Sequence, residues 1–120
     1  MQDSIQITSS PIAEQPGCFL LALEGDLDSS NAQDIVKYVQ NLTAQNGSVH
    51  LVADFSRLRY INSTGLGAIL RISKMLLSKD GSFKIASPNE SVFEIIEIVG
   101  ANKLLNVYPT KEEALESLKN

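Results

Sequence analysis

Two adjacent hydroxyl side chains, Ser63 and Thr64, have the residue types and the position to take part in chemistry. They begin a predicted helix over residues 63–79, directly after Asn62 and before Gly65. The free N–H groups and the dipole at a helix N-terminus favour negative charge. A phosphate on either hydroxyl would therefore be accepted without unfolding the helix. The alternative is purely structural: Asn62 or Ser63 caps the helix, as short polar residues commonly do.

Two glycines, Gly65 and Gly67, fall in the first turns of the same predicted helix. Glycine in a helix interior costs about 1 kcal/mol relative to alanine, so another interaction must offset the loss. We expect these glycines to permit close backbone approach, either by a strand of this chain or by a binding partner.

Asp26 and Asp28 form a second candidate group, at the start of a predicted helix over residues 28–46. Paired carboxylates can serve acid–base catalysis, but no acid–base partner and no set of metal ligands accompanies this pair. We therefore expect either a structural role, in a turn and a helix cap, or contact with a partner.

Cys18 and His50 are each the only residue of their type. One cysteine and one histidine cannot form a Cys/His metal cluster. His50 lies inside a predicted strand, where we expect a satisfied or surface histidine rather than a catalytic base. Cys18, beside Phe19 and Leu20, is expected to be a small buried hydrophobe. The sequence thus predicts a protein that is not an enzyme and that uses no metal or cofactor.

The charge balance argues against nucleic acid and membrane. The chain has 10 Lys and Arg against 14 Asp and Glu, a formal net charge of −4, and no basic run. Nucleic acids and anionic membranes require positive patches, and no apolar run approaches the roughly 20 residues that span a bilayer. Hydrophobic residues make up 43% of the 120 residues, enough for the core of one domain over residues 1–120. With no secretory signal visible, we expect a cytoplasmic protein.

Alternating or apolar runs predict five strands, and amphipathic runs predict four helices. The strands are expected at residues 4–8, 18–24, 49–55, 82–86 and 104–108, and the helices at residues 28–46, 63–79, 87–99 and from residue 110 onward. Ser30 with Gln33, and Ser87 with Glu90, fit capping boxes at two helix starts. The proline-broken residues 10–17 are expected to be a loop.

The order β-β-α-β-α-β-α-β-α predicts an α/β fold. Strands that alternate with helices favour parallel pairing with right-handed crossovers. The first two strands have only a short loop between them, so they are expected to be antiparallel neighbours. We therefore predict a small, mixed and mostly parallel sheet packed with four helices. Ligands and partners of such sheets usually meet the carboxyl ends of the strands.

The segment from Asp54 to Gly67 resembles the signature of STAS domains, specifically the bacterial anti-sigma-factor antagonists. That signature runs roughly Asp-Leu-Ser and then Asp-Ser-Ser/Thr-Gly-Leu-Gly, and residues 54–56 and 63–67 match it. A second element, Leu-x-Gly-Glu/Asp-Leu-Asp, matches residues 23–28. A third, Ser-Pro opening a helix that ends near Gly, matches residues 87–100. The resemblance extends from about residue 5 to residue 118 and implies the STAS fold.

The resemblance also implies a function. Members of this family bind an anti-sigma factor that is also a serine kinase. The kinase phosphorylates the serine at the position of Ser63 and the complex separates, and a serine phosphatase restores it. Thr64 is the second choice for the phosphoacceptor. The expected contact surface consists of two groups, at the starts of the first and second helices: Asp26, Asp28, Asn62, Ser63, Thr64, Gly65 and Leu66.

One residue departs from the family pattern, because Asn62 stands where the family usually has Asp. Asn caps a helix as well as Asp but carries no charge. The change puts kinase recognition, and with it phosphorylation itself, in question.

Three other interpretations remain. A STAS domain can serve another assembly without phosphorylation, for example as an accessory domain of a transporter. A receiver domain of similar size would need an acidic pair after the first strand and a Lys before Pro109, and the chain has neither. An unrelated sensor of small ligands or nucleotides would need a pocket motif, but Gly65-x-Gly67 lacks the third glycine of a dinucleotide site.

Overall fold

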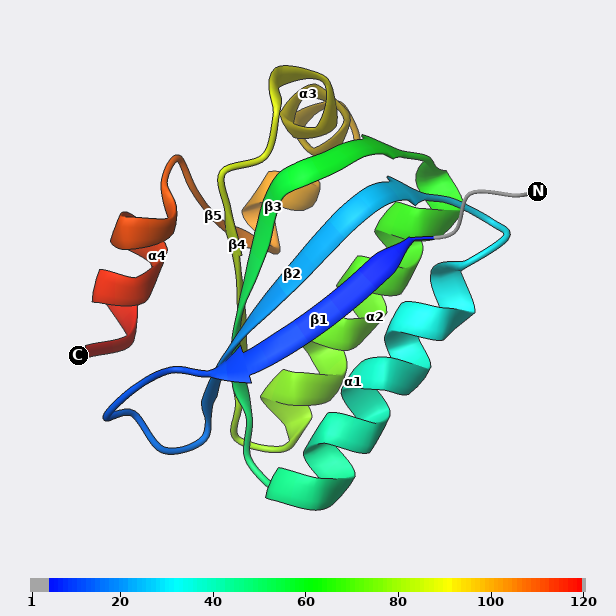
Figure 1. Cartoon of the computed structure of the whole chain (residues 1–120). Helices are drawn as coiled ribbons and strands as arrows, with labels where there is room; N and C mark the ends of the chain where they lie inside the picture. Colours follow the sequence, from blue (N-terminus) through cyan, green and yellow to red (C-terminus); the bar gives the residue numbers. More distant parts are fainter. Residues whose placement is uncertain (1–4, 120) are drawn as a thin grey trace.

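A computed structural model describes residues 5–119 of the chain (Figure 1). The strands are β1 (Gln6–Pro11), β2 (Cys18–Leu27), β3 (His50–Ile61), β4 (Ser82–Ala86) and β5 (Asn106–Tyr108). The helices are α1 (Ala32–Asn46), α2 (Ser63–Ser78), α3 (Glu90–Ile98) and α4 (Lys111–Glu116), with 3-10 turns at Ala101–Lys103 and Ser117–Lys119. The predicted order of strands and helices is confirmed.

The five strands form one sheet in the order β1-β2-β3-β4-β5. β1 is antiparallel to β2, and the remaining neighbours are parallel. This confirms the predicted α/β fold with a mixed, mostly parallel sheet. Residues 12–17 form turns without a helix, as expected. Ser10 and Pro11 of the predicted loop instead belong to β1, where they pair with β2. Ser4 of the predicted first strand lies outside the described residues.

Strand alternation divides the core between the two faces of the sheet. Leu51, Ala53 and Phe55 of β3 are fully buried on the face covered by α1 and α2. Val52 points to the opposite face, where it packs with Ala114 of α4. Figure 1 shows α1 and α2 side by side against one face, α4 on the other side and α3 across one end of the sheet.

β3 is longer than predicted and ends at Ile61 rather than at Phe55. Its last residues alternate less regularly, yet Leu58 and Ile61 are fully buried while Arg57 and Arg59 are exposed. β2 likewise continues beyond Glu24 to Leu27 and pairs with this extension of β3. β2 and β3 thus extend together beyond the end of β4. The turns that follow them therefore lie at this end of the sheet.

Two predicted helix caps are wrong. α1 begins at Ala32 with Asn31 as N-cap, so Ser30 and Gln33 form no capping box. α3 begins at Glu90, and its N-cap is Asn89, whose side chain accepts a hydrogen bond from the Val92 N–H at 2.7 Å.

In both cases an asparagine, Asn31 or Asn89, is the N-cap in place of the predicted serine. The amide group of each asparagine also donates a hydrogen bond to a backbone carbonyl outside the helix. Asn89 Nδ2 donates to the Leu58 carbonyl of β3 at 3.1 Å, a bond that a Ser87 hydroxyl in the predicted cap would not provide. Of the two candidate caps of α2, Asn62 and Ser63, Asn62 is the N-cap, and the N-cap of α4 is Thr110. β5 is shorter than predicted, because the chain before Asn106 forms a 3-10 turn.

Candidate functional site

Two turns lie side by side at the carboxyl ends of β2 and β3. In the register of this parallel pair, Asp26 lies opposite Tyr60, and Leu27 lies opposite Ile61. The Asn62 N–H donates to the Leu27 carbonyl at 3.2 Å, which joins the two turns. The structure therefore brings together the two groups of candidate residues that are far apart in the sequence.

Asn62 fixes the start of α2. Its Oδ1 accepts a hydrogen bond from the Gly65 N–H at 2.9 Å, and its Nδ2 lies 3.4 Å from Ser29 Oγ in the neighbouring turn. Ser63 is the first residue of the helix, and both Ser63 and Thr64 are exposed. An accessible hydroxyl thus lies on backbone whose conformation is set by a capped helix, next to unpaired helical N–H groups that favour an anion.

Gly65 permits the close approach of β2 that its position in the helix suggested. A Cβ at Gly65 would lie 2.6 Å from the Leu27 carbonyl oxygen and 2.9 Å from Leu27 Cγ. Gly67 differs, since a Cβ there would meet no atom within 4 Å. The close approach of β2 therefore explains why residue 65 is a glycine. The open side of Gly67 faces solvent, beside the exposed hydroxyls of Ser63 and Thr64.

The seven predicted contact residues differ in exposure. Ser63 and Thr64 are exposed, and Asp26, Asp28 and Asn62 are half-buried. Gly65 and Leu66 are buried, with Leu66 only 3% exposed. These two residues shape the start of α2 and offer almost no surface to a partner.

The two aspartates have different surroundings. Asp26 Oδ1 lies 3.2 Å from Arg59 Nε, and the two side chains are 41% and 65% exposed, so this ion pair contributes at most about 1 kcal/mol. Asp28 lies in the turn before α1, where its Oδ1 accepts hydrogen bonds from the N–H and the hydroxyl of Ser30 at 2.9 and 2.6 Å. Asp28 is therefore a turn residue and not the cap of the helix.

Asn31 is a positioning residue of this turn that the sequence pattern did not reveal. It is 5% exposed, donates through Nδ2 to the Asp26 carbonyl at 2.8 Å and accepts from the Asp28 N–H at 2.9 Å. One side chain therefore holds the backbone of both aspartates. The signal available in the sequence was an asparagine three residues after Asp28, the spacing at which a side chain can reach back to a backbone N–H.

We expect Asn31→Ala to lower the free energy of unfolding by about 1–3 kcal/mol, because it leaves two backbone groups without their partner. Urea denaturation measures the effect, and Ser30→Ala, at an exposed neighbouring position, is the control. If Asn31→Ala lowers the free energy of unfolding no more than Ser30→Ala does, the Asn31 side chain does not hold the turn.

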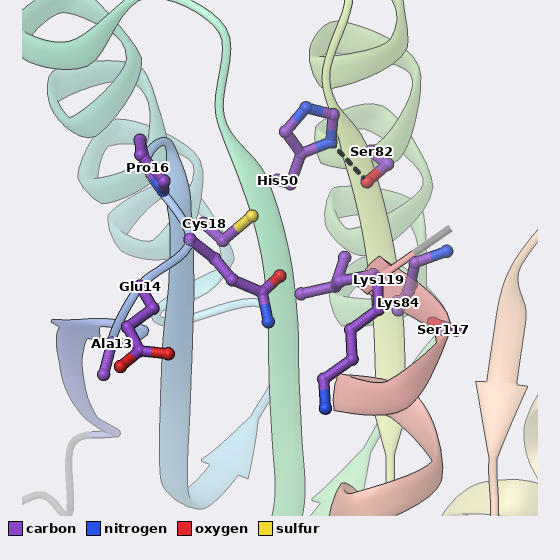
Figure 2. A pocket seen from close by; sticks show the side chains of 11 residues that line it. Ala13, Glu14, Pro16, Cys18, His50, Ser82, Lys84, Ser117 and Lys119 are labelled. Carbon is purple, nitrogen blue, oxygen red and sulfur yellow. Dashed lines mark hydrogen bonds between the residues drawn. The ribbon is translucent and has the colours of Figure 1, made fainter.

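Cys18 and His50 lie at the opposite end of the sheet from Ser63, where β2 and β3 begin. His50 Nδ1 is 2.8 Å from Ser82 Oγ, so this histidine is satisfied, as expected. His50 and Ser82 line a pocket of about 880 Å³, together with residues of the β1–β2 loop and of the 3-10 turn after α4. Figure 2 shows these side chains. Cys18 is buried, as expected, and burial raises the pKa of its thiol, so it stays neutral and a poor nucleophile at pH 7.

The acidic, cysteine and histidine side chains are scattered over the fold. Residues 5–119 contain no group of three or more His, Cys, Asp and Glu side chains that could hold a metal ion. Within the same part of the chain, every helix is too short or too polar to cross a bilayer.

Comparisons with known proteins point in one direction. A family model described as "STAS domain" matches residues 9–114. A Thermotoga neapolitana protein named as an anti-sigma factor antagonist is 31% identical over 94 residues, which cover 78% of this chain and 83% of that protein. The anti-sigma F factor antagonist of Paenibacillus polymyxa is 24% identical over 103 residues, 86% of this chain and 88% of that protein.

Solved structures agree with the observed fold. A crystal structure from Thermotoga maritima, named as an anti-sigma factor antagonist, matches with a TM-score of 0.81 and 26% identity over 95% of both chains. The phosphorylated form of SpoIIAA, a Bacillus cell fate determinant, matches with a TM-score of 0.68 and 21% identity over 96% of this chain and 99% of that chain. At this identity the second match shows a shared fold alone.

Proposed function

The chain belongs to the STAS domain family, and from this premise we propose that it is an anti-sigma-factor antagonist in a partner switch controlled by phosphorylation. Residues 1–120 form one such domain, a cytoplasmic binding module that catalyses no reaction. Its unphosphorylated form binds an anti-sigma factor that is also a serine kinase. Phosphorylation of Ser63 releases this partner, and a serine phosphatase restores the complex.

The observation that carries the proposal is the exposed Ser63 hydroxyl at the capped start of α2. A kinase can reach this hydroxyl without unfolding the helix, because the hydrogen bond from the Gly65 N–H to Asn62 holds the backbone on either side of it. The phosphate formed there lies at a helix N-terminus, where its charge is favoured. The side chain at position 63 can therefore change from a small neutral hydroxyl to a larger charged phosphate while the backbone of α2 stays unchanged.

The proposed contact surface combines this helix start with the neighbouring turn. Ser63 and Thr64 are exposed, and the half-buried Asp28 lies in the turn that the Leu27 carbonyl joins to Asn62. The open side of Gly67 leaves room for a partner to approach the first turns of the helix closely. The buried Leu66 supports this surface from below rather than contacting the partner.

Incubation with candidate kinases and ATP, followed by intact-mass and peptide mass spectrometry, tests the proposal. We expect one phosphate on the wild-type chain, located at Ser63, and none on Ser63→Ala unless it moves to Thr64. Thr64→Ala is the matched control and should still accept the phosphate. A wild-type chain that accepts no phosphate from its physiological partner would instead favour an unregulated STAS domain of another assembly.

Asn62→Asp is expected to change the rate of phosphorylation while leaving the free energy of unfolding within about 0.5 kcal/mol of wild type, since both residues cap well. The contact with Ser29 can survive, because the serine hydroxyl can donate to a carboxylate. The new negative charge lies beside Ser63, the phosphoacceptor, and changes the electrostatic surface that the kinase must recognise. Initial phosphorylation rates and urea denaturation measure the two effects, and an unchanged rate would show that the kinase does not sense this position.

A further inference from the structure

Four large aliphatic side chains are exposed along the later parts of α2 and α3 and the turn that follows α3. The exposed fractions are 66% for Leu77, 76% for Ile98, 57% for Val99 and 72% for Leu104. Single exposed hydrophobic residues are ordinary, but exposed hydrophobic residues that lie together mark an interaction surface, and Leu77 and Leu104 line the same hollow.

A groove connects α2 to the turn after α3. Leu70 and Leu77 of α2 and Leu104 line a hollow of about 410 Å³, whose remaining lining includes Arg71 and Lys74. Leu77 lies about 20 Å along the helix axis from Ser63, at a rise of 1.5 Å per residue. The groove is therefore separate from the start of α2, where the proposed kinase contact lies.

The exposed charges on the two helices have opposite signs. On α2, Arg71 and Lys74 are exposed, and neither forms an ion pair with a carboxylate among residues 5–119. On α3, Glu94 and Glu97 are exposed directly before Ile98. One helix thus presents basic and aliphatic side chains, and the other presents acidic and aliphatic side chains.

This pattern is complementary to itself. In a two-fold symmetric pair, any contact between surface A of one copy and surface B of the other is formed twice. The α2 groove, with Arg71 and Lys74, can receive the acidic end of α3 from a second copy, while its own α3 enters the groove of that copy. Both sets of exposed aliphatic residues are then removed from water together.

We propose that a second copy of this chain docks on this surface, the dimer patch, defined by Arg71, Lys74, Leu77, Glu94, Glu97, Ile98 and Leu104. The dimer forms through cross-contacts between α2 of one copy and α3 of the other. The groove in this dimer patch lies along α2, away from Ser63 at the start of that helix. The inference does not depend on the proposed function.

Sedimentation equilibrium of the full unphosphorylated chain, over a range of concentrations up to about 0.5 mM, tests the proposal. We expect a reversible dimer whose dissociation constant rises with NaCl, because the opposed charges are screened. Lys74→Glu and Glu97→Lys should each weaken the dimer at least about tenfold by placing like charges opposite each other. The double variant Lys74→Glu/Glu97→Lys should regain much of the loss, since the charges are opposite again.

Lys37→Glu is the matched control, because it makes the same charge change at an exposed position on α1. It should leave the dissociation constant within about twofold of wild type. Leu77→Ser should weaken the dimer without unfolding the chain, since this side chain is largely exposed, and circular dichroism checks the fold. A wild-type chain that stays monomeric at every concentration overturns the proposal, as does a dimer that the charge variants do not affect.

Discussion

Phosphorylation of Ser63 is expected to weaken binding of the proposed kinase partner at least about a hundredfold while the domain stays folded. The phosphate adds a charge of about −1.5 to −2 at neutral pH, on a chain whose formal net charge is already −4. At a packed interface this charge must be desolvated against a surface shaped for a small hydroxyl, which costs several kcal/mol. Each 1.4 kcal/mol is a tenfold loss of affinity.

Four forms of the protein test whether the charge at Ser63 controls binding. Isothermal titration calorimetry should give tight binding for wild type and Ser63→Ala, and weak binding for Ser63→Glu and the phosphorylated chain. All four should show the same circular-dichroism spectrum, because a negative charge at a helix N-terminus is favourable.

Ser48→Glu controls for net charge, since it adds a carboxylate at an exposed position before β3, at the opposite end of the sheet. It should bind like wild type. Equal affinities for all the forms would reject the switch, and weak binding by Ser48→Glu would assign the effect to overall charge.

The second large effect concerns folding. Gly65→Ala should lower the free energy of unfolding by about 1–3 kcal/mol or more, the usual range for overpacking a core. The new methyl group would lie 2.6 Å from the Leu27 carbonyl oxygen, a backbone atom that cannot move without shifting β2. The turn that begins at Asp28 follows directly after this strand, so the variant should also disturb the proposed contact surface.

Gly67→Ala is a matched control on the same helix, two residues away. A Cβ there meets no atom within 4 Å, so the higher helix propensity of alanine should raise stability by up to about 1 kcal/mol. Thermal and urea denaturation compare the two variants. Equal effects would mean that the approach of Leu27 to Gly65 is not what requires glycine.

Local patterns were enough to predict much of this fold and part of the site. The antiparallel β1–β2 pair follows from the short loop between them, and the parallel pairs follow from the helices between the later strands. The start of α2 could be predicted because Asn62 and Gly65 interact within one helical turn. Such features depend on residues only a few positions apart.

The missed features depend on residues far apart in the sequence. Asn89, and not Ser87, caps α3 because its amide also reaches the Leu58 carbonyl on β3. β3 extends to Ile61 because the end of β2 pairs with it, which no pattern within β3 could indicate. By contrast, the family resemblance leads us to expect Asp28 and Ser63 on one surface, which local patterns alone do not predict because it depends on the register of β2 against β3.

The strand order β1-β2-β3-β4-β5 also bears on how the chain folds during synthesis. Each strand lies beside the one made just before it, so the sheet can grow in the order in which the ribosome releases it. The parallel pairs join residues more than 20 positions apart, which slows folding relative to local contacts, but each strand finds its neighbour among residues already made, at about 5–20 residues per second. The turn at Asp28 and the start of α2 are released before α4, which covers the other face last. The surface proposed for the kinase can therefore form while the C-terminal helix is still in the ribosome.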